Sequence, residues 1–548
     1  MTATRPPFEN EDAQVTVTRR APEPPPEEQL APQPAPALSR REFLPRAAVA
    51  AAGLVAAGVV GYELPHRSGS RPGSSPGAGH KSSASPSSAT GTAGSAPAQT
   101  FVTRPDLRPP AVRVTQFADD PAPGSTPRFI LLAPMNAGPP SGPQQGLMMV
   151  DRRGRLVWFA PASRGPRFNL DVQSYGGKPV LTWWQGSVSS AHGYGVGKIG
   201  DAAYHPVTSI HAGGGLQTDL HDLKLTSRGT ALITAYETTT ADLTSLGRSS
   251  KGQVFAGHVQ EVDLTTGRVL FDWNSLDHVG IGESLQPPPR HGQGYDYFHL
   301  NSVGETHDGN LLICARNTSA LYKVDRSTGK VLWRLGGNRS DFSVSSAARF
   351  WWQHDARAHG GSRITLFDNA GPDKEKRSRG LVLSVDHAAK RVELERAFVH
   401  PAGFIAGTLG NVQLFSDGGA FVGWGSQSYF SQYAPDGTLI LDGELPVGVR
   451  SYRAYLADWV GRPADGPRMV AQPDPAGGFA VHASWNGATE VARWTVLAGR
   501  DRSSLSPVGA QAWTGFETAI VVNSKGPAFC VVAHDARGRE LGRSPVVE

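Results

Sequence analysis

The sequence predicts an all-β protein, in which a six-bladed β-propeller precedes a small β-sandwich. Three observations predict this fold: 64 Gly and 43 Pro among 548 residues, short apolar runs that end in glycine turns, and a repeated turn motif. Abundant Gly and Pro interrupt helices and favour tight turns, so this composition is typical of turn-rich β structure. The length of the chain indicates more than one domain.

A turn motif recurs along the chain and provides the blade count. Each clear copy has an aspartate, then a glycine, a basic residue and an apolar strand. Copies recur about every 60 residues or closer, and one longer gap leaves room for a further turn near residues 201–207. The count predicts six blades between residues 127 and 465, with Asp151, Asp263 and Asp325 as turn formers. The copies lie at 151–158, 263–271 and 325–333, with degenerate copies at 386–392 and 435–440.

Residues 468–548 differ in pattern from the propeller region. Apolar and polar residues alternate there, and turns are frequent, which predicts strands at 479–485, 491–496 and 529–534. About 80 residues of this kind are typical of a small β-sandwich. No catalytic constellation is present, so a structural or glycan-facing role is expected.

The N-terminal region predicts export. Residues 1–38 are rich in Pro, Glu and Ala and are expected to be disordered. At 39–66, a twin-arginine sequence precedes an Ala/Gly/Val run, which indicates a twin-arginine signal or a membrane anchor. The Ser/Gly/Pro/Ala-rich residues 67–126 are expected to form a linker. These features predict export by the twin-arginine machinery, with the protein released or tethered at the outer face of the cytoplasmic membrane.

Composition argues against several classes of partner. The net charge of +5 is spread along the chain, and no basic cluster is interleaved with aromatic residues, so no nucleic-acid binding is expected. Cys314 and Cys530 are predicted to be buried free thiols, and no Cys/His cluster has zinc spacing. No phosphate-binding loop motif is present. The sequence therefore predicts neither a metal nor a cofactor.

Three histidines occupy equivalent positions in the repeat. His221, His299 and His354 each lie at the entrance of an apolar strand that follows a loop. A fourth unit, at 410–424, has the same frame without a histidine, so the fold does not require one. Because the innermost strands of propeller blades surround one axis, the three histidines are expected to converge on one pocket. His354, in Gln353-His354-Asp355, is expected to be the reactive one.

The blocks around these histidines resemble the bacterial arylsulfotransferase family. The resemblance covers roughly residues 127–465 and is most specific between 215 and 370. It implies a six-bladed propeller that transfers a sulfuryl group between phenols through a sulfohistidine, without a nucleotide donor. The residues that carry it lie at 296–303, 308–325, 325–336, 353–356 and 366–369.

The resemblance also implies roles for individual residues. The family's nucleophile falls on His354, and its other catalytic residues fall on His221, His299 and Arg316. A neutral imidazole is a good nucleophile near neutral pH, and a guanidinium offers a planar set of donors to sulfuryl oxygens. Asp355 or Gln353 is expected to set the tautomer of His354. The residues expected to contact substrate are Asn301, Gln353, Tyr297 and Trp352, the last two by stacking on aryl rings.

Three other functions remain open at this level. A propeller hydrolase of sulfate esters would use the same pocket and release free sulfate. A non-catalytic protein would present its surfaces to cell-wall glycans or a partner. A metal centre built from the three histidines is the last alternative, although no acidic partner pattern supports it. The leading hypothesis is an enzyme whose partners are an aryl sulfate and a phenol.

Overall fold

A computed structural model describes residues 98–118, 128–136, 142–290, 293–371, 377–524 and 526–548, which belong to one compact unit. Nearly all regular structure in these ranges is β-strand, so the predicted all-β class is confirmed. The predicted disordered region 1–38 and export segment 39–66 lie outside the described residues. Within the described ranges, no helix is long and apolar enough to cross a membrane.

Between residues 129 and 457, the described strands form six antiparallel meanders of four strands each. Two meanders share one sheet because β7 also pairs with β9. The meanders are β26 (Val449–Ala457), β2 (Phe129–Asn136), β3 (Gly146–Asp151) and β4 (Leu156–Pro161); β5 (Arg167–Tyr175), β6 (Lys178–Ser189), β7 (His192–Gly200) and β8 (Pro206–Ile210); β9 (Thr218–Leu225), β10 (Thr230–Ala241), β11 (Gly252–Asp263) and β12 (Val269–Asn274); β13 (Leu300–Glu305), β14 (Leu311–Ala315), β15 (Ala320–Val324) and β16 (Val331–Gly336); β18 (His354–His359), β19 (Arg363–Asp368), β20 (Arg379–Asp386) and β21 (Arg391–Val399); and β22 (Asn411–Leu414), β23 (Ala420–Gly423), β24 (Tyr429–Tyr433) and β25 (Leu439–Glu444).

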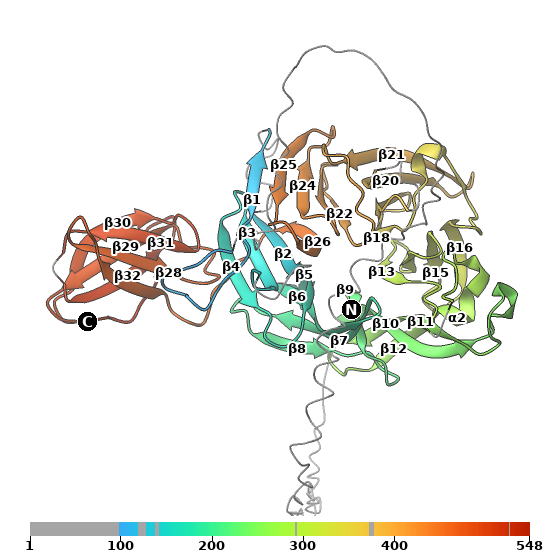
Figure 1. Ribbon diagram of the computed structural model, residues 1–548, viewed down its shortest axis with the longest axis horizontal. Coiled ribbons are helices and arrows are strands. Elements are labelled where there is room, and N and C mark those ends of the chain that lie inside the picture. The colour runs from blue at the N-terminus through green and yellow to red at the C-terminus, as the bar shows by residue number, and fades with distance from the viewer. Residues whose placement is uncertain (1–97, 119–127, 137–141, 291–292, 372–376, 525) are drawn as a thin grey trace, which may run out of the picture. The chain divides into compact units, whose positions relative to one another are not determined.

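The first strands of the six meanders form a closed ring. In the order β5, β9, β13, β18, β22 and β26, each strand contacts the next and the last contacts the first. Figure 1 shows the sheets arranged around the common centre that these strands surround. The ring closes because β26 pairs with β2, which comes from the opposite end of this region. This propeller-like arrangement brings side chains from distant parts of the sequence to one axis.

The repeated turn joins the third and fourth strands of each meander. Asp263 Oδ1 accepts the backbone N–H groups of Thr265 and Thr266, and Asp325 Oδ1 has the same role in its turn. Gly267 adopts φ 70° there, a left-handed conformation that favours glycine. The further turn expected near 201–207 is present, since Asp201 accepts the backbone N–H of Ala203 and of His205.

Five of the six inner strands carry an irregularity near their start. In β18 the pairing with β19 shifts register between His354 and Arg357, and Asp355 adopts φ 54°. Comparable shifts affect β5, β9, β13 and β26, whereas β22 pairs regularly with β23. A β-bulge breaks the strict alternation of side chains and re-aims neighbouring residues. The bulges therefore influence which groups the residues near the start of each of these strands contact.

Part of the predicted linker 67–126 is folded, which corrects that boundary. Among its described residues, β1 (Arg113–Gln116) pairs with β25, and Leu107 is fully buried in an apolar core. The backbone N–H and hydroxyl of Thr103 both donate to Glu517. The proline-rich composition suggested a spacer, but the described residues pack against the ring and the C-terminal sheets.

The C-terminal region contains two facing antiparallel sheets. One has the order β27-β28-β31, and the other has the order β30-β29-β32-β33. Apolar residues from both sheets share one core around Trp494 and Val531. Cys530 in β32 and Cys314 in β14 are both buried and free, as predicted. The strands are β27 (Arg468–Pro473), β28 (Phe479–Ser484), β29 (Arg493–Gly499), β30 (Ser506–Ala512), β31 (Glu517–Val522), β32 (Ala528–His534) and β33 (Glu540–Arg543).

Only short elements complete the described structure. They are β17 (Ser343–Val344), which pairs with β21, the helix α2 (Ser275–His278) and the 3-10 turns η1 (Thr244–Leu246), η2 (Ile281–Glu283) and η3 (Ser346–Ala348).

Candidate active site

The structure brings the three predicted histidines together at the ring of inner strands. His221 lies in β9, His299 directly precedes β13, and His354 begins β18. The ring centroids of His221 and His299 are 4.9 Å apart, and those of His299 and His354 are 6.4 Å apart. His221 and His354 are almost fully buried. Each of the three comes from a different meander, so only the closed ring makes this cluster.

The hydrogen bonds of His354 determine its tautomer. Its Nδ1 lies 2.7 Å from the Asn369 side-chain oxygen and 3.0 Å from the carbonyl oxygen of Trp352. Both are acceptors, so Nδ1 carries the proton. Its Nε2 accepts a long hydrogen bond of 3.3 Å from the backbone N–H of Leu409 and therefore holds the lone pair. Burial, together with the charge of Arg316, holds the pKa of His354 well below 6.5. The imidazole is thus neutral, and Nε2 is its unprotonated nitrogen.

The predicted orientation of His354 by Asp355 or Gln353 is wrong. Asp355 instead accepts a hydrogen bond of 2.6 Å from Arg357. The Gln353 amide donates to the carbonyl oxygens of Ala315 and Ala320, and Gln353 is fully buried. Adjacency in sequence failed as a guide because the bulge in β18 separates the surroundings of His354 from those of its neighbours.

His221 and His299 share a local design that sequence reasoning missed. His221 Nδ1 lies 2.5 Å from Asp219 Oδ1, and His299 Nδ1 lies 2.5 Å from Asp296 Oδ2. Each aspartate also accepts the backbone N–H of its histidine, at 2.9 Å in both cases. The carboxylates hold the proton on Nδ1 and leave Nε2 available. The signal in the sequence was an aspartate two or three residues before each histidine.

Electrostatics in the cluster favour neutral forms of His299 and His354 and charged forms of Asp219 and Asp296. Burial lowers the pKa of His299 to about 4, against the opposing effect of Asp296. Burial alone would raise the pKa of Asp219, but His221 beside it holds that pKa below its ordinary value. Asp296 behaves in the same way, mainly through His299. His299 and His354 are therefore uncharged near neutral pH, and Asp219 and Asp296 are anions beside the cluster.

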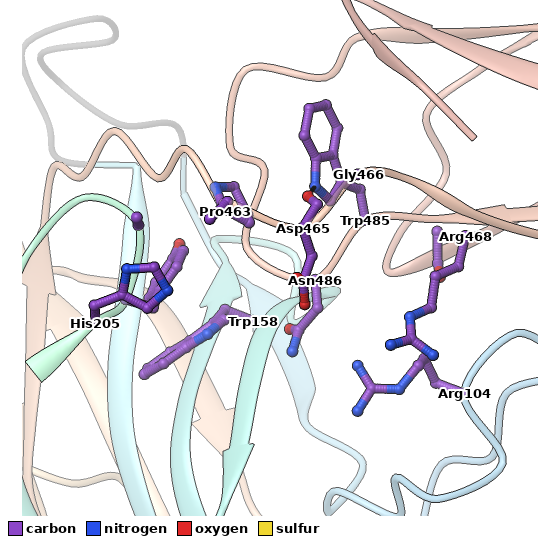
Figure 2. A pocket seen from close by; sticks show the side chains of 13 residues that line it. Arg104, Trp158, His205, Pro463, Asp465, Gly466, Arg468, Trp485 and Asn486 are labelled. Atoms are coloured by element: carbon purple, nitrogen blue, oxygen red, sulfur yellow. Dashed lines mark hydrogen bonds between the residues drawn. The ribbon is translucent and has the colours of Figure 1, made fainter. Parts of the chain in front are cut away.

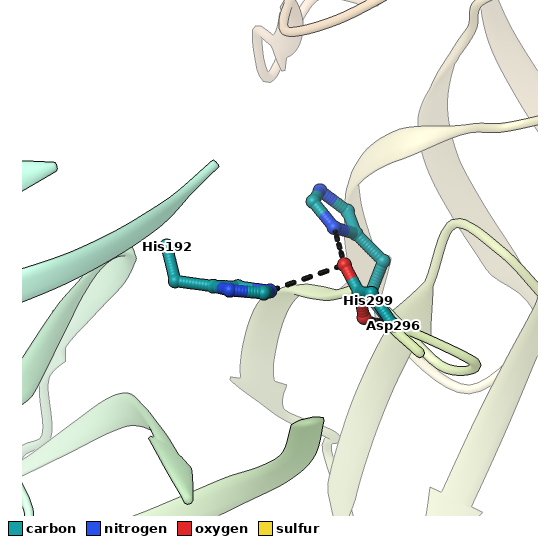
Figure 3. A group of neighbouring side chains, drawn as sticks. All are labelled: His192, Asp296 and His299. Carbon is teal, nitrogen blue, oxygen red and sulfur yellow. Dashed lines mark hydrogen bonds and ion pairs between the residues drawn. The ribbon is translucent and has the colours of Figure 1, made fainter. Parts of the chain in front are cut away.

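Asp296 also binds a fourth histidine, His192, which was not predicted. His192 Nε2 lies 3.1 Å from the same Asp296 oxygen that binds His299 (Figure 3). These three residues also offer a set of metal-ligand atoms within 4.8 Å of one another. Two nitrogens on one tetrahedral zinc ion would be about 3.3 Å from the carboxylate oxygen, given Zn–N bonds of about 2.0–2.1 Å. The distance from His299 Nδ1 to the Asp296 oxygen is 2.5 Å, which is shorter than this, so a shared proton fits that contact better than a zinc ion.

Arg316 supplies an unneutralised cation beside the histidines. Its guanidinium stacks at 4.5 Å over the ring of Trp352 and donates to Asn317 Oδ1 at 2.8 Å. No ion pair joins Arg316 to a carboxylate within the described ranges, and its buried Nε has no partner there. Burial lowers the pKa of Arg316 to about 10, so it remains charged. A buried cation with a spare donor is suited to an anion.

The four predicted substrate-binding residues divide into two groups. Trp352 lies at the cluster, where its ring faces Arg316 and its backbone adopts φ 54°. Tyr297 is fully buried against Phe298 in an apolar core, and Asn301 is fully buried and donates to the carbonyl of Gln353. In the structure Tyr297 packs in a core and Asn301 and Gln353 form hydrogen bonds between neighbouring segments, and substrate contact stays a prediction for all three.

Tyr452 in β26 is a further residue of the cluster that sequence reasoning missed. Its ring centroid is 5.8 Å from that of His221 and 6.5 Å from that of His354. Burial raises the pKa of Tyr452 well above 10, and its hydroxyl is buried without a partner in the described structure. It is thus an uncharged donor without a fixed acceptor. Its sequence context contains no motif that would have identified it.

A buried ion network lies next to the histidines in sequence and in space. Asp222, which follows His221, binds Arg453 at 2.7 Å and Arg357 at 2.9 Å. Arg357 also binds Asp355, and Arg453 donates to the carbonyl of Asn301. The network joins β9, β13, β18 and β26 across the ring, and its two cations balance two anions. The network thereby connects the strands that carry the site to one another.

A separate cavity of about 220 Å³ lies away from the histidine cluster, next to the C-terminal sheets. Figure 2 shows Arg104 and Arg468 close together on one side and His205 with Trp158 on the other. Asn486, which also lines it, exchanges two hydrogen bonds with the Phe159 backbone. No predicted site residue lines this cavity. It belongs to the contact between the C-terminal sheets and the ring.

Comparison with known proteins identifies one family. The family model described as Arylsulfotransferase (ASST) matches residues 171–445, half of the chain. No curated protein matches the sequence. A match over this range includes all four histidines of the cluster and Arg316.

Solved structures resemble the chain only distantly. A protein of unknown function from Bacteroides caccae is 10% identical, with 60% of this chain and 98% of that chain covered and a TM-score of 0.35. A protein from Lactobacillus plantarum is 13% identical, with coverage of 71% and 98% and a TM-score of 0.31. An inactive virginiamycin B lyase from Staphylococcus aureus is 9% identical, with coverage of 70% and 95% and a TM-score of 0.27. Likeness at this level supports no argument about function.

Proposed function

Because the chain belongs to the arylsulfotransferase family, we propose that it transfers a sulfuryl group from an aryl sulfate to a phenol through a sulfohistidine at His354. The observation that carries this proposal is the state of His354. Its Nδ1–H donates to Asn369 and Trp352, which leaves the lone pair on Nε2, and the charge of Arg316 acts on the same ring. A fixed nucleophile beside an unpaired cation suits attack on an anionic ester.

In the first step, the Nε2 lone pair of His354 attacks sulfur, and the bond between sulfur and the aryl oxygen breaks. The electron pair leaves with the phenolate oxygen. Sulfuryl transfer resembles phosphoryl transfer, in which charge is spread over three equatorial oxygens. We assign Arg316 and the Tyr452 hydroxyl to those oxygens, because each has a buried donor without a partner in the described structure. The phenolate leaves as an anion and takes a proton from solvent, so this step needs only the neutral form of His354.

In the second step, an acceptor phenol replaces the released phenol. The Nε2 atom of His221 or His299 takes the proton of the acceptor hydroxyl. The phenolic oxygen attacks sulfur, the S–N bond breaks, and its electron pair returns to His354 Nε2. Each step conserves atoms and charge without a nucleotide, a metal or a cofactor. Asp219 and Asp296 stabilise the imidazolium forms.

Three broader features belong to the same proposal. The closed ring of six meanders is taken to be a six-bladed propeller. The two C-terminal sheets are taken to be a fibronectin type III-like sandwich over residues 468–548. The twin-arginine sequence at 39–66 supports export to the outer face of the membrane or beyond, where an aryl sulfate donor needs no nucleotide supply.

The proposal is tested with a chromogenic aryl sulfate, with and without an added phenol. We expect rapid release of the chromogenic phenol only when the acceptor is present, together with a new sulfated phenol of equal amount. Release of free sulfate without acceptor would instead identify a hydrolase. Absence of turnover on any aryl sulfate, with retention on cell-wall glycans, would identify a binding protein.

Activity is expected to persist at unusually low pH. An ordinary imidazole loses its nucleophilic form below about pH 6.5. Burial lowers the pKa of His354 and brings that of His299 to about 4, so both stay neutral until the pH falls much further. The value of kcat/KM should therefore be constant from neutral pH to about pH 5 and fall below it. A decline centred near pH 6.5 would contradict this assignment.

Replacing Arg316 with glutamine is expected to lower kcat by about 10²–10³-fold, because the transition state loses its cationic donor. Replacement with lysine should restore little, since an ammonium ion lacks the planar fork and the stacking on Trp352. Steady-state kinetics on one aryl sulfate check both variants. The matched control is Arg396→Gln, which removes an arginine of β21 that donates to the Gly418 carbonyl, away from the histidine cluster. Equal effects of R316Q and R396Q would contradict the role.

A further inference from the structure

We infer that His192 is a positioning residue of the sulfuryl-transfer site, which acts on His299 through the Asp296 carboxylate and does not itself touch substrate. This inference rests on the proposed function. It starts from the shared Asp296 oxygen, which lies 2.5 Å from His299 Nδ1 and 3.1 Å from His192 Nε2 (Figure 3). One carboxylate oxygen thus accepts from two imidazoles that belong to different meanders.

The surroundings of His192 leave its ring one polar contact in the described structure. His192 is fully buried at the start of β7, with its ring 4.0 Å from that of Tyr236 and 4.5 Å from that of Phe255. Its Nδ1 is buried without a hydrogen-bond partner there. Because the Asp296 oxygen can only accept, Nε2 carries the proton and donates it. Two aromatic rings and one hydrogen bond therefore fix this imidazole.

His192 lies apart from the residues that are proposed to react with the substrate. The rings of His192 and His299 are 6.0 Å apart, and no contact joins His192 to His354 or Arg316 in the described structure. By contrast, His299 is the member of the cluster whose side chain keeps 12% of its surface exposed. His299 is thus accessible to a substrate, whereas His192 reaches the site only through Asp296.

The shared oxygen gives His192 an electrostatic role. A donor from His192 withdraws part of the Asp296 charge that would otherwise stabilise protonated His299. The other groups facing His299 are His221 of β9, Arg316 after β14 and His354 of β18, with Tyr236 of β10 near Asp296. Arg316 and His221 oppose its protonation, and Asp296 favours it. Removing the His192 donor strengthens the effect of Asp296 alone, so His299 should protonate at higher pH.

Two substitutions separate this role from simple packing. His192→Phe keeps an aromatic ring beside Tyr236 and Phe255 but removes the N–H donor. His192→Gln keeps an N–H donor near the position of Nε2. We expect H192F to move the acidic limb of kcat/KM upward by about one pH unit, which lowers kcat/KM at pH 4 about fivefold and leaves it nearly unchanged at pH 6. We expect H192Q to stay close to the wild type in both respects.

The matched control is His400, another buried histidine that binds a carboxylate outside the cluster. His400 Nε2 lies 3.1 Å from Asp442 Oδ2, and its ring packs 4.4 Å from that of Phe404. H400F should leave the pH profile unchanged. If H192F and H192Q lower activity equally and keep the wild-type pH profile, His192 only packs and the inference is overturned.

Histidine titration by NMR makes the test independent of turnover. The pKa of His299, assigned with a His299→Gln reference, should rise by about one unit in H192F and not in H192Q. An unchanged pKa overturns the inference even if transfer is observed. Absence of transfer in the wild type, with the shift present, refutes only the proposed function. Dialysis against a chelator should leave the wild-type profile unchanged; loss of activity that zinc restores would assign these residues to a metal instead.

Discussion

Replacement of His354 by alanine is expected to lower the rate of sulfuryl transfer by at least about 10⁴-fold, which is typical for removal of a catalytic nucleophile. Arg316 and the remaining histidines would still bind the donor, so KM should change far less than kcat. The large loss in kcat is expected because two acceptors on Nδ1 hold the Nε2 lone pair of His354 in place. Rates with a chromogenic aryl sulfate check the prediction.

The same variant tests the covalent intermediate. Incubation of the wild type with donor alone should add one sulfo group to the peptide that contains His354, and H354A should carry none. H400A is the matched control, because it removes a buried histidine of the same fold outside the cluster. Full activity of H354A, or a sulfo group on His221 or His299, would contradict the assignment of the nucleophile.

The largest effect on stability is expected from Asp222. Replacing it with alanine leaves the buried guanidinium groups of Arg357 and Arg453 with Asp355 as their remaining carboxylate in the network. Breaking a buried ion pair by removing one partner typically costs about 3–5 kcal/mol, because a charge stays buried without compensation. We expect a loss of that size in the free energy of unfolding, measured as a lower urea midpoint by tryptophan fluorescence.

Two further variants separate this effect from the loss of any carboxylate. D263A removes an aspartate that binds backbone N–H groups of its own turn, so only a small change in the urea midpoint is expected. The double variant D222A/R453M removes one charge of each sign, so it should be more stable than D222A. If D222A unfolds at the same urea concentration as D263A, the network does not hold the ring together.

These predictions also explain the recurring His-Asp pairs. In His221-Asp222 and His354-Asp355, the histidine belongs to the reactive cluster and the aspartate belongs to the ion network. In a regular strand, two neighbouring side chains point to opposite faces of the sheet. In β9 and β18 a bulge lies at these positions and changes the directions of both side chains. One dipeptide therefore contributes both to chemistry and to the closure of the ring.

Much of the fold followed from local chemistry. The aspartate-glycine turns, including the one near Asp201, are formed by hydrogen bonds within a few residues, so their spacing alone predicted the repeat. The boundary of the predicted linker was wrong because composition does not reveal that Leu107 has a core to enter. A proline-rich segment packs only where another part of the fold offers an apolar surface, and the sequence of the segment itself does not show that surface.

By itself, the sequence determined the all-β class, the six turns and the three histidines at strand entrances, because each depends on neighbouring residues. Only the tertiary structure decided which groups act on those histidines. Asn369 and Leu409 orient His354, Asp296 connects His192 to His299, and Tyr452 completes the cluster. These partners lie on different strands of a closed ring. Their contacts depend on how the bulged strands meet at the axis, which local sequence does not encode.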